Sequence, residues 1–372
     1  MPTAPEFTHL GLTWREGSQQ PTVEDRINLA YRSAYLLIGK GIHGSNGINP
    51  SISARVMVTQ VLPRLIHGLE AAVLSRKAYK ALEDVFKSLM RQHQGLPERT
   101  ATEAVYLLNG TYPVTAYIHY KVLLLFGAIC RLDHDHPLRR LAIRQLSLPD
   151  SSNSWFVYVR AIAAEYDVDL IQAWNMPWDK LLWKKYTKEA VYSRWHIRLV
   201  EEASLKSSLK FLDLQLCYRD KAHPVWDTSR LRTGDTQKAM IRAKLLTGVY
   251  TLQTNIHKMK KSEDDICLLC KSAPEDVRHF ICQCPALQQI RSPWIEQIID
   301  RLNIKLVSVA PNGEELVKLI LNGGKYGLRC TKAWLEDFNT LANNFIYELH
   351  NSRNKILLRI NTKVVPSRTE LH

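Results

Sequence analysis

The sequence predicts an all-α protein, and three observations carry this prediction. Apolar residues recur at helical spacing through most of the 372 residues. Alternation of apolar and polar residues, the pattern of a strand, is nearly confined to the opening segment EFTHLGLTW. Glycine and proline stand where helices are expected to stop or start. We therefore expect a helical chain that opens with one short strand or hairpin.

Composition excludes several classes of protein. A hydrophobic content of 45% suits a globular chain with two or three domains. Neither a signal peptide nor an uncharged stretch long enough to cross a membrane is found. The 7 cysteines, three of them isolated, do not suggest a disulfide framework. We expect an intracellular protein, nuclear or cytoplasmic and not secreted, without a membrane partner or a small-molecule substrate.

The first half of the chain is expected to form helices. Apolar residues at helical spacing in EDRINLAYRSAYLLIGK predict one that ends at Gly39 and Gly41. Pro63 should kink or break the next helix. SRKAYKALEDVFKSLMRQHQGLP follows as an amphipathic helix. Thr100 and Glu103 then predict a capping box at the start of the following helix.

The segment YIHYKVLLLFGAICRL is apolar on nearly every side, which predicts a helix at the centre of a bundle. Its single histidine, His119, is more readily explained as a packed core residue than as a catalytic base. The polar run SLPDSSNS, residues 147–154, has turn formers and no apolar anchor. This run is the expected domain boundary.

Positive charge is concentrated after this boundary. Residues 179–260 hold 17 basic and 8 acidic residues, a net +9 within a chain total of +14. Tryptophans lie among these basic residues, a combination that binds nucleic acids through phosphates and base stacking. The opposing interpretation is a solvated basic surface over a tryptophan core. The residues we expect to contact RNA or DNA are Lys184, Lys185, Arg194, Arg198, Arg242 and Lys244.

The segment CLLCKSAPEDVRHFICQC indicates a structural zinc site. Cys267 and Cys270 have the C-x2-C spacing of a metal-binding turn, and His279 with Cys284 completes a tetrahedral Cys3His set. Such a closed set stabilises a loop that is too polar to fold on its own. Cys282 is the alternative to Cys284, because it shares a helical face with His279. Four cysteines without metal are the remaining alternative.

These residues also carry a resemblance. CLLC and EDVRHFICQCP are similar to the C-terminal zinc-binding segment of non-LTR retrotransposon reverse transcriptases, with an acidic residue, Glu275, four before the histidine and Pro285 after the last cysteine. FTHLG resembles the end of their polymerase palm, and VLPRLIHGLE and LEDVFKSLMRQHQGLP look like the helical thumb that follows. The resemblance implies zinc ligation by Cys267, Cys270, His279 and Cys284, and binding of RNA or DNA.

Departures from the family pattern limit the expected activity. Polymerisation requires paired aspartates that hold two metal ions, and no such pair lies on a strand-like segment here. Glu314, Glu315 and Lys318 lie on one predicted helix, which does not favour a nuclease. Lys271 stands where the family often has glycine, and Val249 where it often has a basic residue. We therefore expect a chain without enzymatic activity.

The expected organisation has five parts. A strand or hairpin at residues 1–22 precedes a thumb-like helical domain at 23–146, a basic helical domain at 155–250, a zinc-binding module at 251–300, and C-terminal helices with a basic tail at 301–372. The expected function is nucleic-acid binding by a transposable-element fragment that lacks the palm. A zinc-stabilised scaffold for protein interactions and a degenerate copy without selected function are the alternatives.

Overall fold

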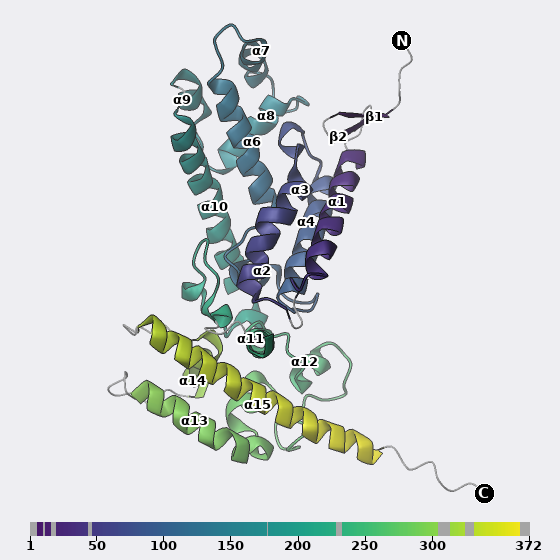
Figure 1. The fold of residues 1–372 in the computed structure, drawn as a ribbon, viewed down its shortest axis with the longest axis vertical. Helices are drawn as coiled ribbons and strands as arrows, with labels where there is room; N and C mark the ends of the chain where they lie inside the picture. The colour runs from purple at the N-terminus through teal and green to yellow at the C-terminus, as the bar shows by residue number, and fades with distance from the viewer. Residues whose placement is uncertain are drawn as a thin grey trace, which may run out of the picture. The chain divides into compact units, whose positions relative to one another are not determined.

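The computed structural model describes residues 6–9, 12–15, 20–43, 47–176, 178–227, 233–303, 313–323 and 331–364. Helices make up nearly all of the regular structure in these ranges, so the predicted all-α class is confirmed (Figure 1). The expected opening hairpin is also present: β1 (Glu6–His9) pairs antiparallel with β2 (Leu12–Arg15). None of the described helices is both long and apolar enough to cross a membrane.

The chain divides into two compact units, which are described separately. Unit 1 comprises residues 1–42, 52–90 and 110–202, and unit 2 comprises residues 43–51, 91–109 and 203–372. This division differs from the sequence-based one, which separated residues 155–250, 251–300 and 301–372. The expected basic tail after residue 364 lies outside the described residues.

Most of unit 1 is a bundle of helices. Its helices, some of which end just beyond the unit, are α1 (Gln20–Ile38), α2 (Pro50–Val56), α3 (Leu62–Ile66), α4 (Arg76–His93), α6 (Val114–Cys130), α7 (Pro137–Leu146), α8 (Trp155–Glu165), α9 (Leu170–Asn175) and α10 (Lys180–Ser204). A π-helical turn, Met57–Val61, separates α2 from α3 just before Pro63, as the expected break at this proline requires.

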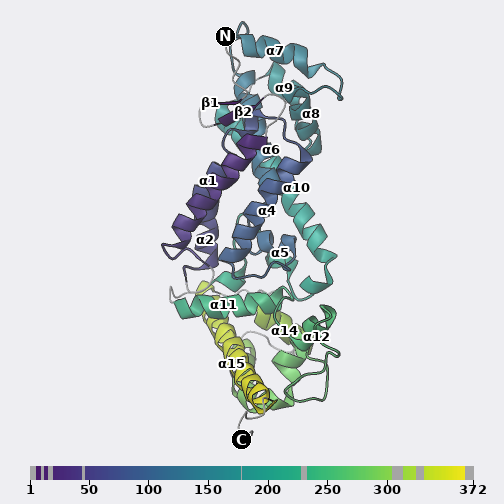
Figure 2. The same cartoon turned by 90° about the vertical axis from the view of Figure 1, so that its right-hand side faces the viewer.

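Helix α6 forms the centre of unit 1, as its uniform apolarity predicts. It packs against α3, α7, α8 and α9 (Figure 1, Figure 2). Trp183 of α10 is 1% exposed, and its indole N–H donates to the carbonyl of Leu123 at 2.8 Å. Gly127 makes this approach possible, because a Cβ atom there would lie 2.1 Å from the indole nitrogen.

His119 is a core residue, as expected, and belongs to a buried polar network. The indole N–H of Trp195 donates to the Tyr166 hydroxyl at 2.8 Å, and this hydroxyl is 2.8 Å from His119 Nδ1. The indole N–H can only donate, so the Tyr166 hydroxyl accepts from Trp195 and also shares a hydrogen bond with His119 Nδ1. Burial, assisted by the charge of Arg198, lowers the pKa of His119 to about 4, so the ring is neutral near pH 7.

The polar run 147–154 lies within unit 1, although it was the expected boundary. Arg160 of α8 donates to the carbonyls of Leu146 and Leu148 at 2.5 and 2.8 Å. Ser154 caps α8 by accepting from the backbone N–H of Phe156 at 3.3 Å. These bonds hold α7 and α8 together across the loop, so a polar composition does not separate domains here.

Unit 2 contains α5 (Thr102–Leu107), α11 (Thr233–Leu246), α12 (Gln253–Lys258), α13 (Gln288–Asn303), α14 (Gly313–Asn322) and α15 (Lys332–Val364). The long helix α15 packs against α11, α13 and α14. Phe338, Phe345, Ile346 and Leu349 on its inner face are fully buried. The segment that carries the clustered cysteines therefore shares a core with the C-terminal helices.

The capping box expected at Thr100 is wrong. Helix α5 begins at Thr102 with Ala101 as its N-cap, and no side chain caps it. The Thr100 hydroxyl instead donates to the carbonyl of Pro97 at 2.7 Å. Glu103 lies 3.7 Å from Lys206. Neither side chain of the predicted box therefore caps the helix, because Thr100 bonds within the preceding turn and Glu103 pairs with Lys206.

Candidate metal centre

A tight turn presents the first two cysteines. The backbone N–H of Cys267 donates to the carbonyl of Ala273, and the N–H of Lys271 donates to the carbonyl of Cys267, each at 2.8 Å. Lys271 adopts a left-handed conformation with φ of 57°. Cys267 and Cys270 therefore project from one end of a narrow loop, as the C-x2-C spacing predicts.

A π-helical turn presents the other two residues. The turn spans His279–Gln283, and the backbone N–H of Cys284 donates to the carbonyl of His279 at 2.8 Å. Asp276 begins it by accepting from the N–H of His279 at 2.7 Å. Because a π-turn is one residue wider than an α-turn, it brings positions i and i+5 to the same side. This is the irregular geometry that ligation by both His279 and Cys284 requires.

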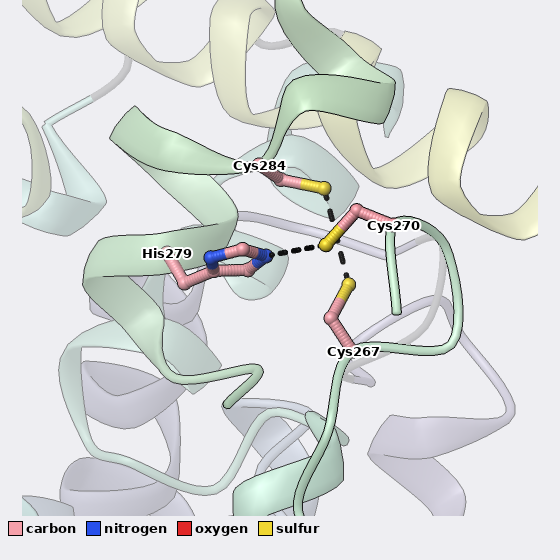
Figure 3. Close-up of side chains that lie close together, drawn as sticks. All are labelled: Cys267, Cys270, His279 and Cys284. Carbon is pink, nitrogen blue, oxygen red and sulfur yellow. Dashed lines mark hydrogen bonds between the residues drawn. The ribbon is translucent and has the colours of Figure 1, made fainter. Parts of the chain in front are cut away.

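The four side chains converge on one point (Figure 3). All the ligand atoms of Cys267, Cys270, His279 and Cys284 lie within 4.8 Å of one another. The sulfur atoms of Cys267 and Cys284 are 3.9 Å apart, and Cys270 Sγ is 3.3 Å from His279 Nε2. Tetrahedral coordination with bonds of about 2.3 Å places neighbouring sulfur ligands about 3.8 Å apart. The cluster can therefore hold a metal ion in a closed tetrahedral site.

Electrostatics at the cluster favour deprotonation of one sulfur of the Cys267–Cys284 pair. The hydrogen bond from Cys284 and then, against burial, the backbone N–H groups of Cys270 and Leu269 lower the pKa of Cys267, whereas the same hydrogen bond and burial raise the pKa of Cys284. Metal ligation requires the thiolate rather than the thiol.

Cys282 is excluded from the cluster, so the geometry selects Cys284. The Cys282 sulfur atom is 4.0 Å from the carbonyl oxygen of Gly313, and this residue is half-buried. Burial raises the pKa of the Cys282 thiol to about 11. This side chain is therefore a neutral packing group in unit 2.

A buried ion pair fixes the loop that carries the Cys3His cluster to helix α15. Arg353 donates from Nε to Glu275 Oε1 and from Nη2 to Glu275 Oε2, both at 2.7 Å. The backbone N–H of Gln253 donates to the same carboxylate at 2.8 Å. Tyr250 stacks on Phe280 of the π-turn with ring centroids 5.6 Å apart, and its hydroxyl contacts His350 Nδ1 at 2.6 Å. The loop thus has polar and aromatic anchors to α15.

A second arginine braces the wide turn. Arg291 of α13 is 3% exposed and donates from Nη1 to the carbonyl of Cys282 at 2.9 Å and from Nη2 to that of Cys284 at 2.5 Å. Neither Arg291 nor Arg353 was predicted as a site residue. Glu275 was noted only as a position that matches the family pattern, and no local signal pointed to the two arginines.

The residues expected to bind nucleic acid lie in different environments. Lys184 and Lys185 on α10 are exposed. Arg194 is also exposed, 3.7 Å from Asp167, and Arg198 is paired with Glu165 at 3.3 Å. Of the tryptophans, Trp183 is core, as the opposing interpretation held. Exposed cations on α10 are thus the accessible part of the expected set.

The two expected residues on α11 are less accessible, and Arg242 is not a surface residue. Its side chain is fully buried and donates from Nε to the carbonyl of Leu321 at 2.9 Å and from Nη1 to Asn343 Oδ1 at 3.1 Å. Burial lowers its pKa to about 9. Lys244 is half-buried, and burial together with Arg99 lowers its pKa. Arg242 therefore organises the core of unit 2, because the inner face of α11 carries it.

The acidic pair considered for a nuclease lies on one helix, as expected. Glu314, Glu315 and Lys318 all belong to α14, and Lys318 is 3.4 Å from Glu314 one turn away.

Comparison with known proteins found no matching family model, no matching curated protein and no matching solved structure. The fold and the cluster thus define an all-α protein with a Cys3His cluster that could hold a metal ion.

Proposed function

We propose that the Cys3His cluster binds one structural Zn²⁺ ion. Three thiolates and one imidazole are the donor set that Zn²⁺ favours, and the geometry leaves no position for a water or a substrate. The observation that carries this proposal is the convergence of four ligand atoms within 4.8 Å through two separately hydrogen-bonded turns. Zinc would contribute folding free energy on the order of 10 kcal/mol to a loop with few apolar residues.

Metal analysis with two matched cysteine variants tests the zinc site. Protein purified without added metal should contain one zinc per chain by plasma mass spectrometry. The Cys284→Ala variant should lose it, and Cys282→Ala should retain it, since Cys282 lies outside the cluster. Equal zinc content in these two variants, or wild-type protein without zinc, would refute the proposal.

We also propose that the chain binds RNA or DNA without catalysing a reaction, as the resemblance to non-LTR retrotransposon reverse transcriptases implies. The first turns of α10 support this function. Lys180, Lys184 and Lys188 recur at intervals of four residues with Lys185 beside them, and no acidic residue lies among them. Lys180, Lys184 and Lys185 are exposed. Such a stripe can follow successive phosphates along a strand.

A salt titration of nucleic-acid binding tests the stripe. In filter-binding experiments with single-stranded RNA and DNA, Lys184→Glu/Lys185→Glu should weaken binding and reduce the slope of log K against log salt by about 1.4, the value for two lost phosphate contacts. The control Lys77→Glu/Lys80→Glu changes net charge equally at exposed positions of α4. Equal losses in the two variants would show that only net charge matters, and unchanged affinity in the α10 variant would refute the proposal.

The arrangement of the described carboxylates supports the proposal of a noncatalytic role. No pair of aspartates on neighbouring strands lies within the described residues, whose only paired strands are β1 and β2. Two-metal phosphoryl transfer needs such a pair. The proposed activity is therefore to hold a nucleic acid within an intracellular assembly, with zinc ordering the C-terminal part of unit 2.

A further inference from the structure

Helices α7, α8 and α9 of unit 1 enclose a groove that neither zinc nor nucleic-acid binding explains. Its volume is about 550 Å³, and its lining is mainly apolar: Ile143, Leu146, Ala163, Val168, Leu170 and Trp174. Ile143 and Ile171 at its edge are 56% and 75% exposed, so the groove opens to solvent. A cavity of several hundred Å³ with aromatic and aliphatic walls is typical of a binding site.

The walls of this groove are held in place. Arg139 lies over the Trp174 ring, 5.1 Å from its centroid, and Trp174 packs near Phe126 with centroids 6.4 Å apart. Arg160, in the lining, bonds the two carbonyls at the end of α7 and also pairs with Asp150. Asp169, the other charged lining residue, caps α9 by accepting from the N–H of Gln172 at 2.9 Å. Both charged groups of the described lining are therefore engaged.

Unengaged charge lies on the rim instead. Arg140 and Arg144 of α7 are exposed, and neither side chain pairs with a carboxylate in the described parts of the chain. At 100° per residue, Arg140 lies about 60° and Arg144 about 100° around α7 from Ile143, on the side away from Leu146. Arg140 and Arg144 are separated by about 6 Å along the helix axis. Two acidic residues one turn apart on a partner helix have the same separation.

We propose that this groove binds an amphipathic helix of a partner protein, with its apolar face in the groove and acidic residues against Arg140 and Arg144. Apolar side chains one turn apart are the anchors by which a helix occupies such a groove. A small ligand fits less well, because the lining is mainly apolar and its only charged groups are Arg160, already bonded to two carbonyls, and the N-capping Asp169. Positive charge along the rim selects acidic partners and speeds their association.

Fluorescence anisotropy with the full-length chain tests this proposal. The probe is a labelled peptide of about 18 residues with leucines at i, i+3, i+4 and i+7 and two flanking glutamates one turn apart. A peptide of the same composition in scrambled order and one with lysines for the glutamates are the controls. We expect the acidic amphipathic peptide to bind about tenfold or more tightly than either control.

Two protein variants locate the binding. Ala164→Trp places a bulky side chain in the groove at an exposed lining position and should weaken binding about tenfold. Arg140→Glu/Arg144→Glu should weaken the acidic peptide and favour the lysine peptide. Lys184→Glu/Lys185→Glu, designed to weaken nucleic-acid binding, should leave peptide affinity unchanged. Circular dichroism confirms that each variant folds.

Several outcomes would overturn the proposal. These are absence of peptide binding, equal binding of the scrambled peptide, and equal affinity in the Ala164→Trp variant. Binding of dodecanoate, lost in Ala164→Trp while the peptide fails to bind, would identify a small-amphiphile site instead. A wild-type dimer in sedimentation that becomes monomeric in Ala164→Trp would identify a second copy of this chain as the occupant.

Discussion

Glu275 and Arg353 form a buried bidentate ion pair across 78 residues of sequence, with both oxygen–nitrogen distances at 2.7 Å. Their side chains are 1% and 6% exposed. Removing one partner of such a pair leaves an unpaired charge in the core. This pair should therefore be among the most sensitive positions of unit 2.

Substitution of Arg353 by Ala should lower the free energy of unfolding by about 3–5 kcal/mol. Urea unfolding of the metal-loaded protein, followed by circular dichroism, measures the change. Glu275→Leu/Arg353→Leu should recover part of the loss, because no unpaired charge remains. Glu263→Gln, at an exposed acidic residue nearby, is the control and should change stability by less than about 0.5 kcal/mol. A loss for Arg353→Ala no larger than this control's would contradict the assignment.

Lys271 is a second test, because its φ of 57° costs free energy in a residue with a side chain. Lys271→Gly should stabilise the loop by up to about 1 kcal/mol and increase its resistance to a chelator. Lys261→Gly is the matched control, since Lys261 is exposed and is not among the residues with positive φ. It should be neutral or destabilising. The proposed strain at Lys271 is refuted if both variants lose stability equally.

The pH dependence of stability should contain a contribution from His119. The pKa of this residue is lowered by burial to about 4, against 6.5 in an unfolded chain. Between pH 6.5 and 4 the unfolded chain binds a proton that folded His119 does not, so stability falls as pH falls through this window. At pH 5 the loss is roughly 1–2 kcal/mol.

His119→Gln removes this contribution and keeps a side chain that can hydrogen-bond to the Tyr166 hydroxyl. Urea unfolding at pH 7 and pH 5 should show a smaller loss of stability for this variant than for the wild type. His134→Gln is the control, because His134 is exposed. His93 and His223 are also buried, with pKa values lowered by burial to about 4 and about 3, so the variant should retain some pH dependence. Parallel pH dependence in all three proteins would contradict a neutral, buried His119.

Gly127 should tolerate no side chain. The Cβ atom of Ala at this position would meet the indole of Trp183 at 2.1 Å, so Gly127→Ala should destabilise the protein by about 1–3 kcal/mol despite the higher helix propensity of Ala. Gly39→Ala is the control, since its nearest contact would be 3.5 Å. Thermal unfolding of both variants measures the difference. A Gly127→Ala protein as stable as Gly39→Ala would show that α6 and α10 can separate without cost.

The helices and the residues of the Cys3His cluster were largely predictable from sequence, because both depend on local spacing. Uniform apolarity predicted the central position of α6, and the C-x2-C spacing predicted two residues of the cluster. The choice between Cys282 and Cys284 stayed open. An α-turn and a π-turn differ by one residue in the span of their hydrogen bonds, and sequence spacing alone does not reveal which one forms. The structure settles it through the bond from Cys284 to His279.

Tertiary contacts account for what the sequence could not predict. Arginine is a residue type usually found at the surface. Arg242 is accommodated in the core because Leu321 and Asn343, far along the chain, accept hydrogen bonds from its guanidinium group. The polar run 147–154 met the criteria for a linker, yet Arg160 bonds its start to α8. Arg353 likewise acquires its role from Glu275 alone. Each depends on a partner that no local pattern names.

The π-turn at His279–Gln283 fixes the number of residues that can separate His279 from Cys284. Deleting one residue between the imidazole and the final thiolate would restore ordinary helical winding and rotate that sulfur by about 100° away from the other three. Related chains should therefore tolerate changes of residue type in this interval far better than insertions or deletions. The four-residue spacing between this histidine and the last cysteine is therefore a more discriminating search pattern than the identity of any residue within it.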